Sequence, residues 1–196
     1  MANRDKIILD LCGGTGAWSK PYKDAGYDVR LITLPDNDVR TYIPPKNVYG
    51  ILAAPPCTMF SLARTKAKKP RDLKEGMECV RACLDIIWSC RETKKLDFWA
   101  LENPMGYLRQ FLGKPAFTFD ASQFSCDYNK HTDLWGYFKE PKKNVGYSRF
   151  PSTDKNTRIL PAIPAEYNID KNMSKIAIRR SITSSLFASA FFKANL

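Results

Sequence analysis

The sequence contains a single histidine, His131, among its 196 residues. Metal centres built from several histidines and catalytic triads of the Ser-His-Asp type both need imidazole groups at defined places. The scarcity of histidine therefore argues against both classes of site, and we assign no metal. We expect His131 to lie at the surface or close to a bound substrate.

Long apolar runs are also absent, since none approaches the roughly 20 residues that a membrane-spanning helix needs. The start of the chain has no charged segment followed by an apolar signal core. The six cysteines do not require a disulfide framework, because a domain of this size folds without one. We expect a protein of the cytoplasm with reduced thiols.

Acidic residues are few relative to basic ones, with 20 Asp and Glu against 31 Lys and Arg and a formal charge of +11. Such an excess creates a positive surface field that attracts polyanions. An ordinary basic protein without a nucleic-acid partner fits the charge equally well. The length suits one domain, and no internal repeat is visible.

Short apolar runs bounded by Gly, Pro, Asn or Asp predict strands at 6–11, 27–33, 49–54 and 97–102. A helix-compatible stretch follows the first strand as far as residue 25, and helical spacing of apolar residues predicts an amphipathic helix over 73–93. Alternating strands and helices imply crossover connections, so we predict a Rossmann-like α/β fold with a doubly wound, mainly parallel sheet. Weaker patterns suggest strands at 117–119 and 134–138, a terminal helix at 184–194 and an irregular basic insertion at 139–175 within a single domain over 1–196.

A glycine-rich turn, Gly13-Gly14-Thr15-Gly16, follows the first predicted strand. Glycine lets the backbone approach a ligand closely, and ligands of parallel sheets bind at the carboxyl ends of the strands. The turn lacks the G-x-G-x-x-G spacing of dinucleotide binders, and such a turn alone is weak evidence.

The third strand runs into Pro55-Pro56-Cys57, a rigid turn that would present a thiol at the same edge of the sheet. Basic neighbours can lower a thiol pKa from about 8.5 and supply thiolate at neutral pH, and several follow in sequence: Arg64, Lys66, Lys68, Lys69 and Arg71. The alternative is that Cys57 is a small buried apolar side chain.

The strand at 97–102 delivers Glu102-Asn103-Pro104 to that edge, and we expect the proline to end the strand. A desolvated carboxyl group with a raised pKa could donate a hydrogen bond to a substrate nitrogen. The alternative is a surface acid at the end of a strand. Three further cysteines, Cys79, Cys83 and Cys90, fall at helical spacing, and we expect core or half-buried packing for them.

The order D-L-C-G-G-T-G (10–16), P-P-C-T-M-F-S (55–61) and E-N-P (102–104) resembles the cytosine-5 DNA methyltransferase family, particularly its short phage-type members. The resemblance extends to Asp38-Val39-Arg40, to the segment K-H-T-D-L-W-G (130–136), and to the end of the chain from Arg180. It covers most of the sequence and implies the methyltransferase type of Rossmann-like fold, in the host cell's cytoplasm if a phage encodes the chain.

The resemblance also implies roles for individual residues. Cys57 would be the nucleophile, Glu102 would bind the amidine edge of cytosine, and Lys130 would stand where family members often carry a base-supporting arginine. S-adenosylmethionine would be bound by Asp10, Leu11, Cys12, Gly13, Gly14, Thr15, Gly16, Trp18, Asp38 and Pro55. DNA would be contacted by Pro56, Ser61, Arg64, Lys66, Lys68, Lys69, Arg71 and Asn103.

The chain departs from the family in two places. The ribose-binding acid expected after the second strand is replaced near Thr33, where Asp36 is a possible substitute. The target-recognition domain is missing, and only the insertion at 139–175 occupies its place, so a protein partner could supply recognition. The sequence therefore predicts a DNA cytosine-5 methyltransferase. Methylation of RNA or of a free cytosine nucleotide, and an inactive nucleic-acid-binding decoy, remain alternatives.

Overall fold

The computed structural model describes residues 2–62, 64, 67–149, 163, 178–179 and 181–196. A six-stranded sheet forms its centre, with short 3-10 turns at Asn3–Asp5 and Ala121–Phe124. The strands and helices are β1 (Ile7–Leu11), α1 (Lys20–Asp24), β2 (Asp28–Ile32), β3 (Val48–Ala53), α2 (Leu73–Glu92), β4 (Phe98–Pro104), α3 (Arg109–Leu112), β5 (Phe117–Asp120), β6 (His131–Tyr137) and α5 (Ser185–Ala194).

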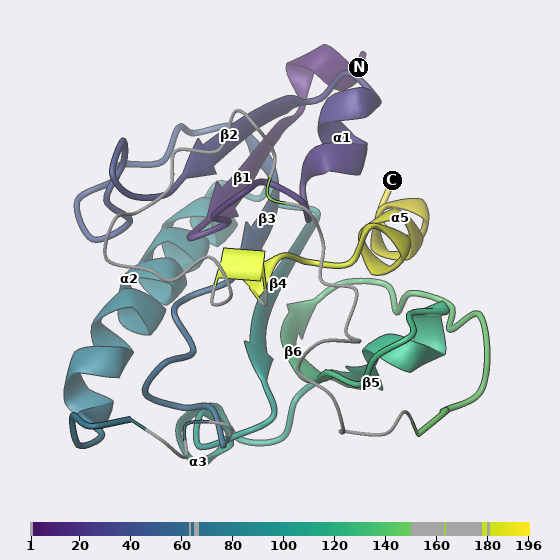
Figure 1. The fold of residues 1–196 in the computed structure, drawn as a ribbon. Coiled ribbons are helices and arrows are strands. Elements are labelled where there is room, and N and C mark those ends of the chain that lie inside the picture. Colours follow the sequence, from purple (N-terminus) through teal and green to yellow (C-terminus); the bar gives the residue numbers. More distant parts are fainter. Residues whose placement is uncertain (1, 63, 65–66, 150–162, 164–177, 180) are drawn as a thin grey trace.

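The strands lie in the order β2-β1-β3-β4-β6-β5. Strand β1 pairs in parallel with β2 and β3, and β3 pairs in parallel with β4, whereas β6 runs antiparallel to both of its neighbours. Figure 1 shows α2 along one side of the sheet and α1 and α5 on the other. The predicted α/β fold with a mainly parallel sheet is thereby confirmed.

Two apolar cores lie on the two faces of this sheet. On one face, Val80, Cys83 and Ile87 of α2 pack among buried residues of β1 and β3. On the other face, aromatic side chains of α1 and α5, including Tyr22 and Phe191, pack on the sheet. All five residues of β1 are buried, because a central parallel strand is covered on both faces.

Helix α2 begins where the sequence pattern placed it, and the carboxylate of Asp72 explains this boundary. This side chain accepts a hydrogen bond of 2.9 Å from the backbone N–H of Glu75, which caps the first turn of the helix. The helix ends at Glu92, within one residue of the prediction.

Strand β4 ends at Pro104, as expected from the proline, although the strand extends two residues beyond the end predicted at 102. Strand β3 pairs with β4 only as far as Leu101, and beyond that point β4 has β6 as its single neighbour. A proline at such a half-exposed strand end leaves no ladder hydrogen bond unmade on its open side.

The insertion predicted at 139–175 is described in part. Residues 139–149 form neither helix nor strand, as expected, while 150–162, 164–177 and Arg180 lie outside the described residues. Within the described part of the chain, no helix has the length and apolar character needed to cross a membrane.

The strand order creates a reversal between β1 and β3. From β1 the chain passes to β2 on one side, and it then returns to form β3 on the other side of β1. In open α/β sheets ligands bind in the crevice at the carboxyl ends of the strands where such a reversal occurs. The glycine-rich turn after β1 and the Pro-Pro-Cys turn after β3 both leave the sheet at this point.

Close contact between β3 and β4 depends on Gly50, where an added Cβ would overlap the ring of Phe98. We expect Gly50→Ala to lower the free energy of unfolding by about 1–3 kcal/mol, because the buried ring must shift. Urea unfolding measures the change. Gly146→Ala is the matched control, since a Cβ there meets nothing within 4 Å. Equal stability of the two variants would contradict this packing.

Candidate functional site

Four segments with polar side chains meet at one edge of the sheet. Strands β1, β3 and β4 are parallel, so the segments that follow them emerge together. Strand β6 is antiparallel to β4, and Lys130, immediately before β6, therefore reaches the same edge. The structure brings together the three residues predicted to be catalytic: Cys57, Glu102 and Lys130.

The glycine-rich turn is built over the carboxylate of Asp10. This side chain is completely buried, and its Oδ2 accepts a hydrogen bond of 2.5 Å from the Ser19 hydroxyl. A Cβ on Gly13 would overlap the carboxylate, so only glycine fits above it. Gly14 and Gly16 have φ values of +56° and +69°, in the left-handed region that glycine adopts without strain. The turn therefore has a conformation that requires glycine, and Thr15 is the one residue of the four that carries a side chain.

Burial raises the pKa of Asp10 from 3.8 to about 6, despite the opposing hydrogen bond from Ser19. Its Oδ1 has no hydrogen-bond partner among the described residues. A buried acceptor in this condition is one that a water molecule or an N–H group of a ligand would satisfy. The carboxylate itself packs against Gly13 of the turn.

Two residues predicted to contact the cofactor contribute to the cores instead. Trp18 is 2% exposed and packs edge-on against Phe191. Leu11 is fully buried, and its carbonyl accepts a hydrogen bond from the N–H of Ala54. Their side chains lie in the apolar cores, Leu11 on one face of the sheet and Trp18 on the other, because burial of apolar surface is favourable. Cys12, Thr15 and the glycines of the turn are partly exposed.

Asp38 lies in the segment after β2 and is bound by the guanidinium of Arg40. Arg40 donates from Nη2 and Nε to this carboxylate at 2.6 and 2.9 Å. This hydrogen bonding lowers the pKa of Asp38 to about 2. A ligand that bound Asp38 would have to share its carboxylate with Arg40.

The turn that carries Cys57 is fixed from several directions. Asn103 of β4 is fully buried and donates from Nδ2 to the carbonyl of Pro55 at 3.0 Å. On either side of the turn, Cβ atoms on Gly76 or Gly106 would overlap Met59 or the Phe60 carbonyl. The backbone on both sides therefore approaches the turn closely. Pro55 is buried, and Pro56 is exposed.

Asn103 was predicted to contact DNA, and its burial excludes that role in this structure. It positions the Pro55 turn, because its amide links the ends of β3 and β4. Ser61 is half-buried, and its segment forms an isolated antiparallel bridge with Gly106.

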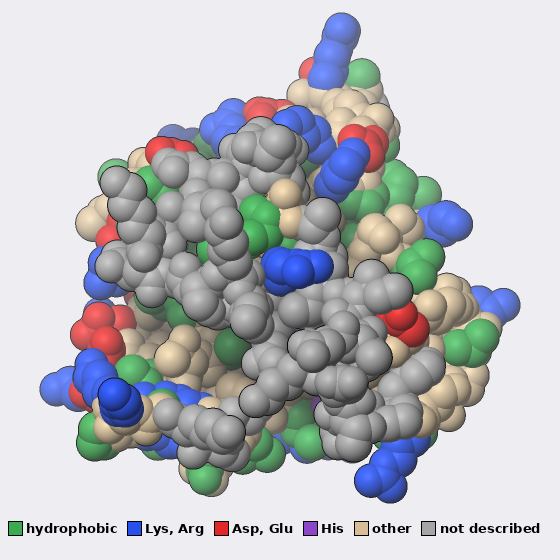
Figure 2. Space-filling model, viewed as in Figure 1, with side chains coloured by type: hydrophobic (Ala, Val, Ile, Leu, Met, Phe, Trp, Pro, Cys, Tyr) green, Lys and Arg blue, Asp and Glu red, His purple; other side chains and the backbone are tan. Residues whose placement is uncertain are grey.

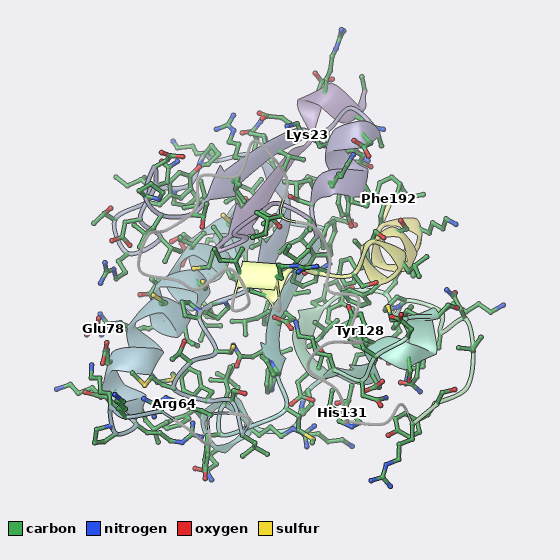
Figure 3. The ribbon with its side chains drawn as sticks, viewed as in Figure 1. Lys23, Arg64, Glu78, Tyr128, His131 and Phe192 are labelled. Carbon is green, nitrogen blue, oxygen red and sulfur yellow. The ribbon has the colours of Figure 1, made fainter. Side chains whose placement is uncertain are left out.

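The basic segment after Cys57 is folded onto the protein itself. Arg71 donates from Nη1 to the carbonyl of Met59 and from Nη2 to that of Ser61, both at 2.8 Å. Arg64 donates from Nη2 to the carbonyl of Lys69 at 2.5 Å, close to the start of α2 (Figure 3).

These contacts change the interpretation of the five basic residues. Arg64 and Arg71 hold the loop, and Lys69 pairs with Glu75 at 2.9 Å, so these cations are engaged within the chain. Lys68 is exposed, and Lys66 lies outside the described residues. Elsewhere, lysine and arginine side chains surround the face drawn in Figure 2 and outnumber the acidic ones there.

The electrostatic balance at Cys57 is set by its two charged neighbours. Burial and the negative charge of Glu102 raise the pKa of the Cys57 thiol, while the positive charge of Lys130 lowers it. Lys130 and Glu102 pair at 3.5 Å between Nζ and Oε1. Both line a small pocket whose other walls include Tyr128, beside β5 and β6 (Figure 3), and Thr183. The pocket is lined by the carboxylate and the amine, and the Cys57 thiol lies outside its lining but close enough to feel both charges.

One feature of this edge had no signal in the sequence. The Cys12 thiol lies beside those of Cys79 and Cys83 of α2, which brings the glycine-rich turn against the helix. Cys83 and Cys90 are buried and Cys79 is half-buried, which confirms the prediction of core or half-buried packing. Among the described residues, no group of His, Cys, Asp and Glu side chains is arranged to hold a metal ion.

His131 is 48% exposed at its side chain and lies at 3.3 Å from Asp120, with its ring stacked on that of Tyr147. The prediction of a surface position is confirmed. Comparison with known proteins adds no assignment, since no model of a protein family and no curated protein matches this chain.

The two charges beside Cys57 have opposite effects on the pKa of its thiol. We expect Glu102→Gln to lower the pKa of the thiol and Lys130→Gln to raise it, because one variant removes a negative charge and the other a positive one. The pH dependence of iodoacetamide labelling at Cys57, followed by mass spectrometry, measures both shifts. A shift in the same direction for both variants would refute the proposed proximity.

The buried Asp10 carboxyl makes stability depend on pH. Its pKa is higher in the folded protein, at about 6, than its ordinary value of 3.8, so the folded state binds the proton more tightly. The free energy of unfolding should fall as pH rises through this window, by up to about 3 kcal/mol. Urea unfolding of wild type and of Asp10→Asn, compared at several pH values, isolates this contribution. A difference between them that is constant with pH would contradict it.

Proposed function

We propose that the protein is a DNA cytosine-5 methyltransferase that uses S-adenosylmethionine as the methyl donor, with a sheet of the corresponding Rossmann-like type. The observation that carries this proposal is the meeting of Cys57, Glu102 and Lys130 beside a glycine-rich turn at the reversal point of the sheet. The motif order D-L-C-G-G-T-G, P-P-C and E-N-P supports the same activity.

The glycine-rich turn suits the cofactor because three of its four residues at 13–16 are glycine, which lets a ligand approach the backbone closely. Asp10 is completely buried beneath Gly13, so it would hold the turn in place rather than touch the ligand. Asp38 would bind the adenine part once its pairing with Arg40 is rearranged. When bound there, S-adenosylmethionine supplies an electrophilic methyl group.

The residues of the site fit the covalent chemistry that this transfer needs. C5 of cytosine becomes nucleophilic when a thiolate adds to C6, and Cys57 is the thiol at the strand end. Glu102 would hold N3 and the exocyclic amino group and stabilise the charge that develops on the ring. Lys130 would favour the Cys57 thiolate and hold the Glu102 carboxyl in place. Loss of the C5 proton and of the thiol from C6 then releases the product.

DNA is the proposed substrate because of the motif resemblance, and the excess of 11 positive charges is compatible with a polyanion. In a duplex the target base must leave the stack before a thiol can reach C6, at a cost of a few kcal/mol. Among the described members of the predicted DNA-binding set in this loop, Pro56, Lys68 and Lys69 are exposed. Ser61, Arg64 and Arg71 are partly exposed. A protein partner would provide sequence recognition.

Binding without catalysis is the second candidate. It is favoured by the raised pKa of Cys57, which keeps the thiol protonated, and by the pairing of Asp38 with Arg40. A nucleic-acid-binding decoy would need neither a thiolate nor a free cofactor carboxylate.

Trapping with 5-fluorocytosine tests the proposal. Random-sequence duplex DNA containing this base should form an adduct with the wild type that survives denaturation, only when S-adenosylmethionine is present, because fluorine cannot leave C5 as a proton does. Cys57→Ser should give no adduct. Cys90→Ala is the control, since Cys90 is buried in α2 away from this edge.

Glu102→Gln should form the adduct at least tenfold more slowly while it still binds the cofactor. Calorimetry with S-adenosylmethionine distinguishes a loss of catalysis from a loss of cofactor binding. Binding of the cofactor without adduct or methyl incorporation would favour the decoy, and no binding at all would overturn the proposed cofactor.

A further inference from the structure

A second surface, remote from Cys57, has the character of a binding site. Between α2 and the sheet lies an open groove of about 310 Å³, to which α2 contributes Leu84, β4 contributes Trp99 and β6 contributes Trp135. Leu112, Lys114, Ala116 and Gly136 complete its walls. Lys114 is the single charged residue among these described wall residues.

Exposed aromatic rings extend this groove. Trp88 lies one helical turn after Leu84 on α2 and is 69% exposed. Tyr137 is directly opposite Trp99 in the pairing of β4 with β6, and it is also 69% exposed. A single exposed aromatic side chain is ordinary, but several of them grouped beside a groove are typical of a surface that binds a partner.

The position of the groove separates it from the candidate catalytic site. Trp99 is the second residue of β4, whereas Glu102 lies near the opposite end of the same strand. The groove lies on the sheet face that α2 covers, and the pocket at Glu102 is lined by residues such as Phe119 and Phe187 of the other core. An occupant of the groove would therefore leave the Cys57 site accessible.

Two exposed cations border the groove, while the exposed acids Asp85 and Glu92 lie farther round α2 from Leu84. Arg91 continues the line of Leu84 and Trp88 along α2 at the spacing i, i+4, i+7, and it is exposed. Lys114 is exposed on the opposite wall. A second copy of this chain would bring another +11 charge to the same place, which disfavours self-association there.

We infer that this groove binds single-stranded DNA. Unpaired bases stack on accessible aromatic rings, and phosphates pair with the cations between them, which is how proteins bind single strands without reading their sequence. Trp88 and Tyr137 are the stacking surfaces, and Arg91 and Lys114 contact the backbone. The choice of DNA over RNA rests on the proposed function, while the stacking surface stands independently of it.

The test uses a 5′-labelled oligothymidylate of about 12 nucleotides, a length within the usual range for one such domain, and follows its anisotropy during titration with the full chain. Trp88→Ala should weaken binding by about tenfold, the loss of one stacked base. Trp88→Phe should restore most of the affinity because it keeps an aromatic face. Lys114→Gln should reduce the slope of log K against log[salt] by about 0.7.

Controls separate the groove from the rest of the surface. Leu186→Ala removes another exposed apolar side chain, 45% exposed on α5, and should bind like wild type. Trp88→Ala should form the 5-fluorocytosine adduct like wild type, so a failure of methyl transfer and a failure of the groove are distinguishable. Thermal unfolding of each variant verifies its fold.

Three results would overturn the inference. The first is absence of oligothymidylate binding by the wild type. The second is unchanged affinity in Trp88→Ala, which would assign the groove to a protein partner. The third is binding of oligouridylate with no binding of oligothymidylate, which would assign it to RNA.

Discussion

The pairing of β1 with β3 and of β3 with β4 is the constraint on which the candidate site depends. Parallel pairing forces the segments after these strands to emerge at one edge, so residues far apart in the sequence, such as Cys57 and Glu102, become neighbours. The antiparallel β6 adds its first residues to the same edge. A change in the direction of any one of these strands would remove a thiol, a carboxylate or an amine from the site.

The second requirement is that the turns at this edge keep their shapes. The structure meets it with close backbone packing and with buried hydrogen bonds. Gly13 fits over the Asp10 carboxylate, and Gly106 fits against the Phe60 carbonyl. Asn103 ties the Pro55 carbonyl to β4. These contacts restrict movement of the Cys57 turn, which favours a preorganised nucleophile.

The charges at the site oppose one another. Glu102 disfavours the Cys57 thiolate, and Lys130 favours it. Burial is the larger influence and also disfavours the thiolate, so the pKa of the Cys57 thiol lies above its ordinary value.

The sequence by itself determined the elements of the fold and the chemistry of the edge. Apolar runs located the strands, helical spacing located α2, and the placement of Cys57 and Glu102 at strand ends followed from the Pro-Pro-Cys and Glu-Asn-Pro turns. Local patterns suffice for these features because each depends on residues close in sequence.

Only the tertiary structure decided which polar groups remain accessible. Arg71, Asn103 and Trp18 were predicted to bind ligands from their residue types and positions in the sequence. In the structure Arg71 and Asn103 hold the Cys57 turn, and Trp18 packs in a core. The groove beside Trp88 and Tyr137 likewise joins α2 to β6, which are distant in sequence. Long-range packing creates these outcomes, and a single residue's type does not reveal whether its partner will be solvent, a ligand or a distant part of the same chain.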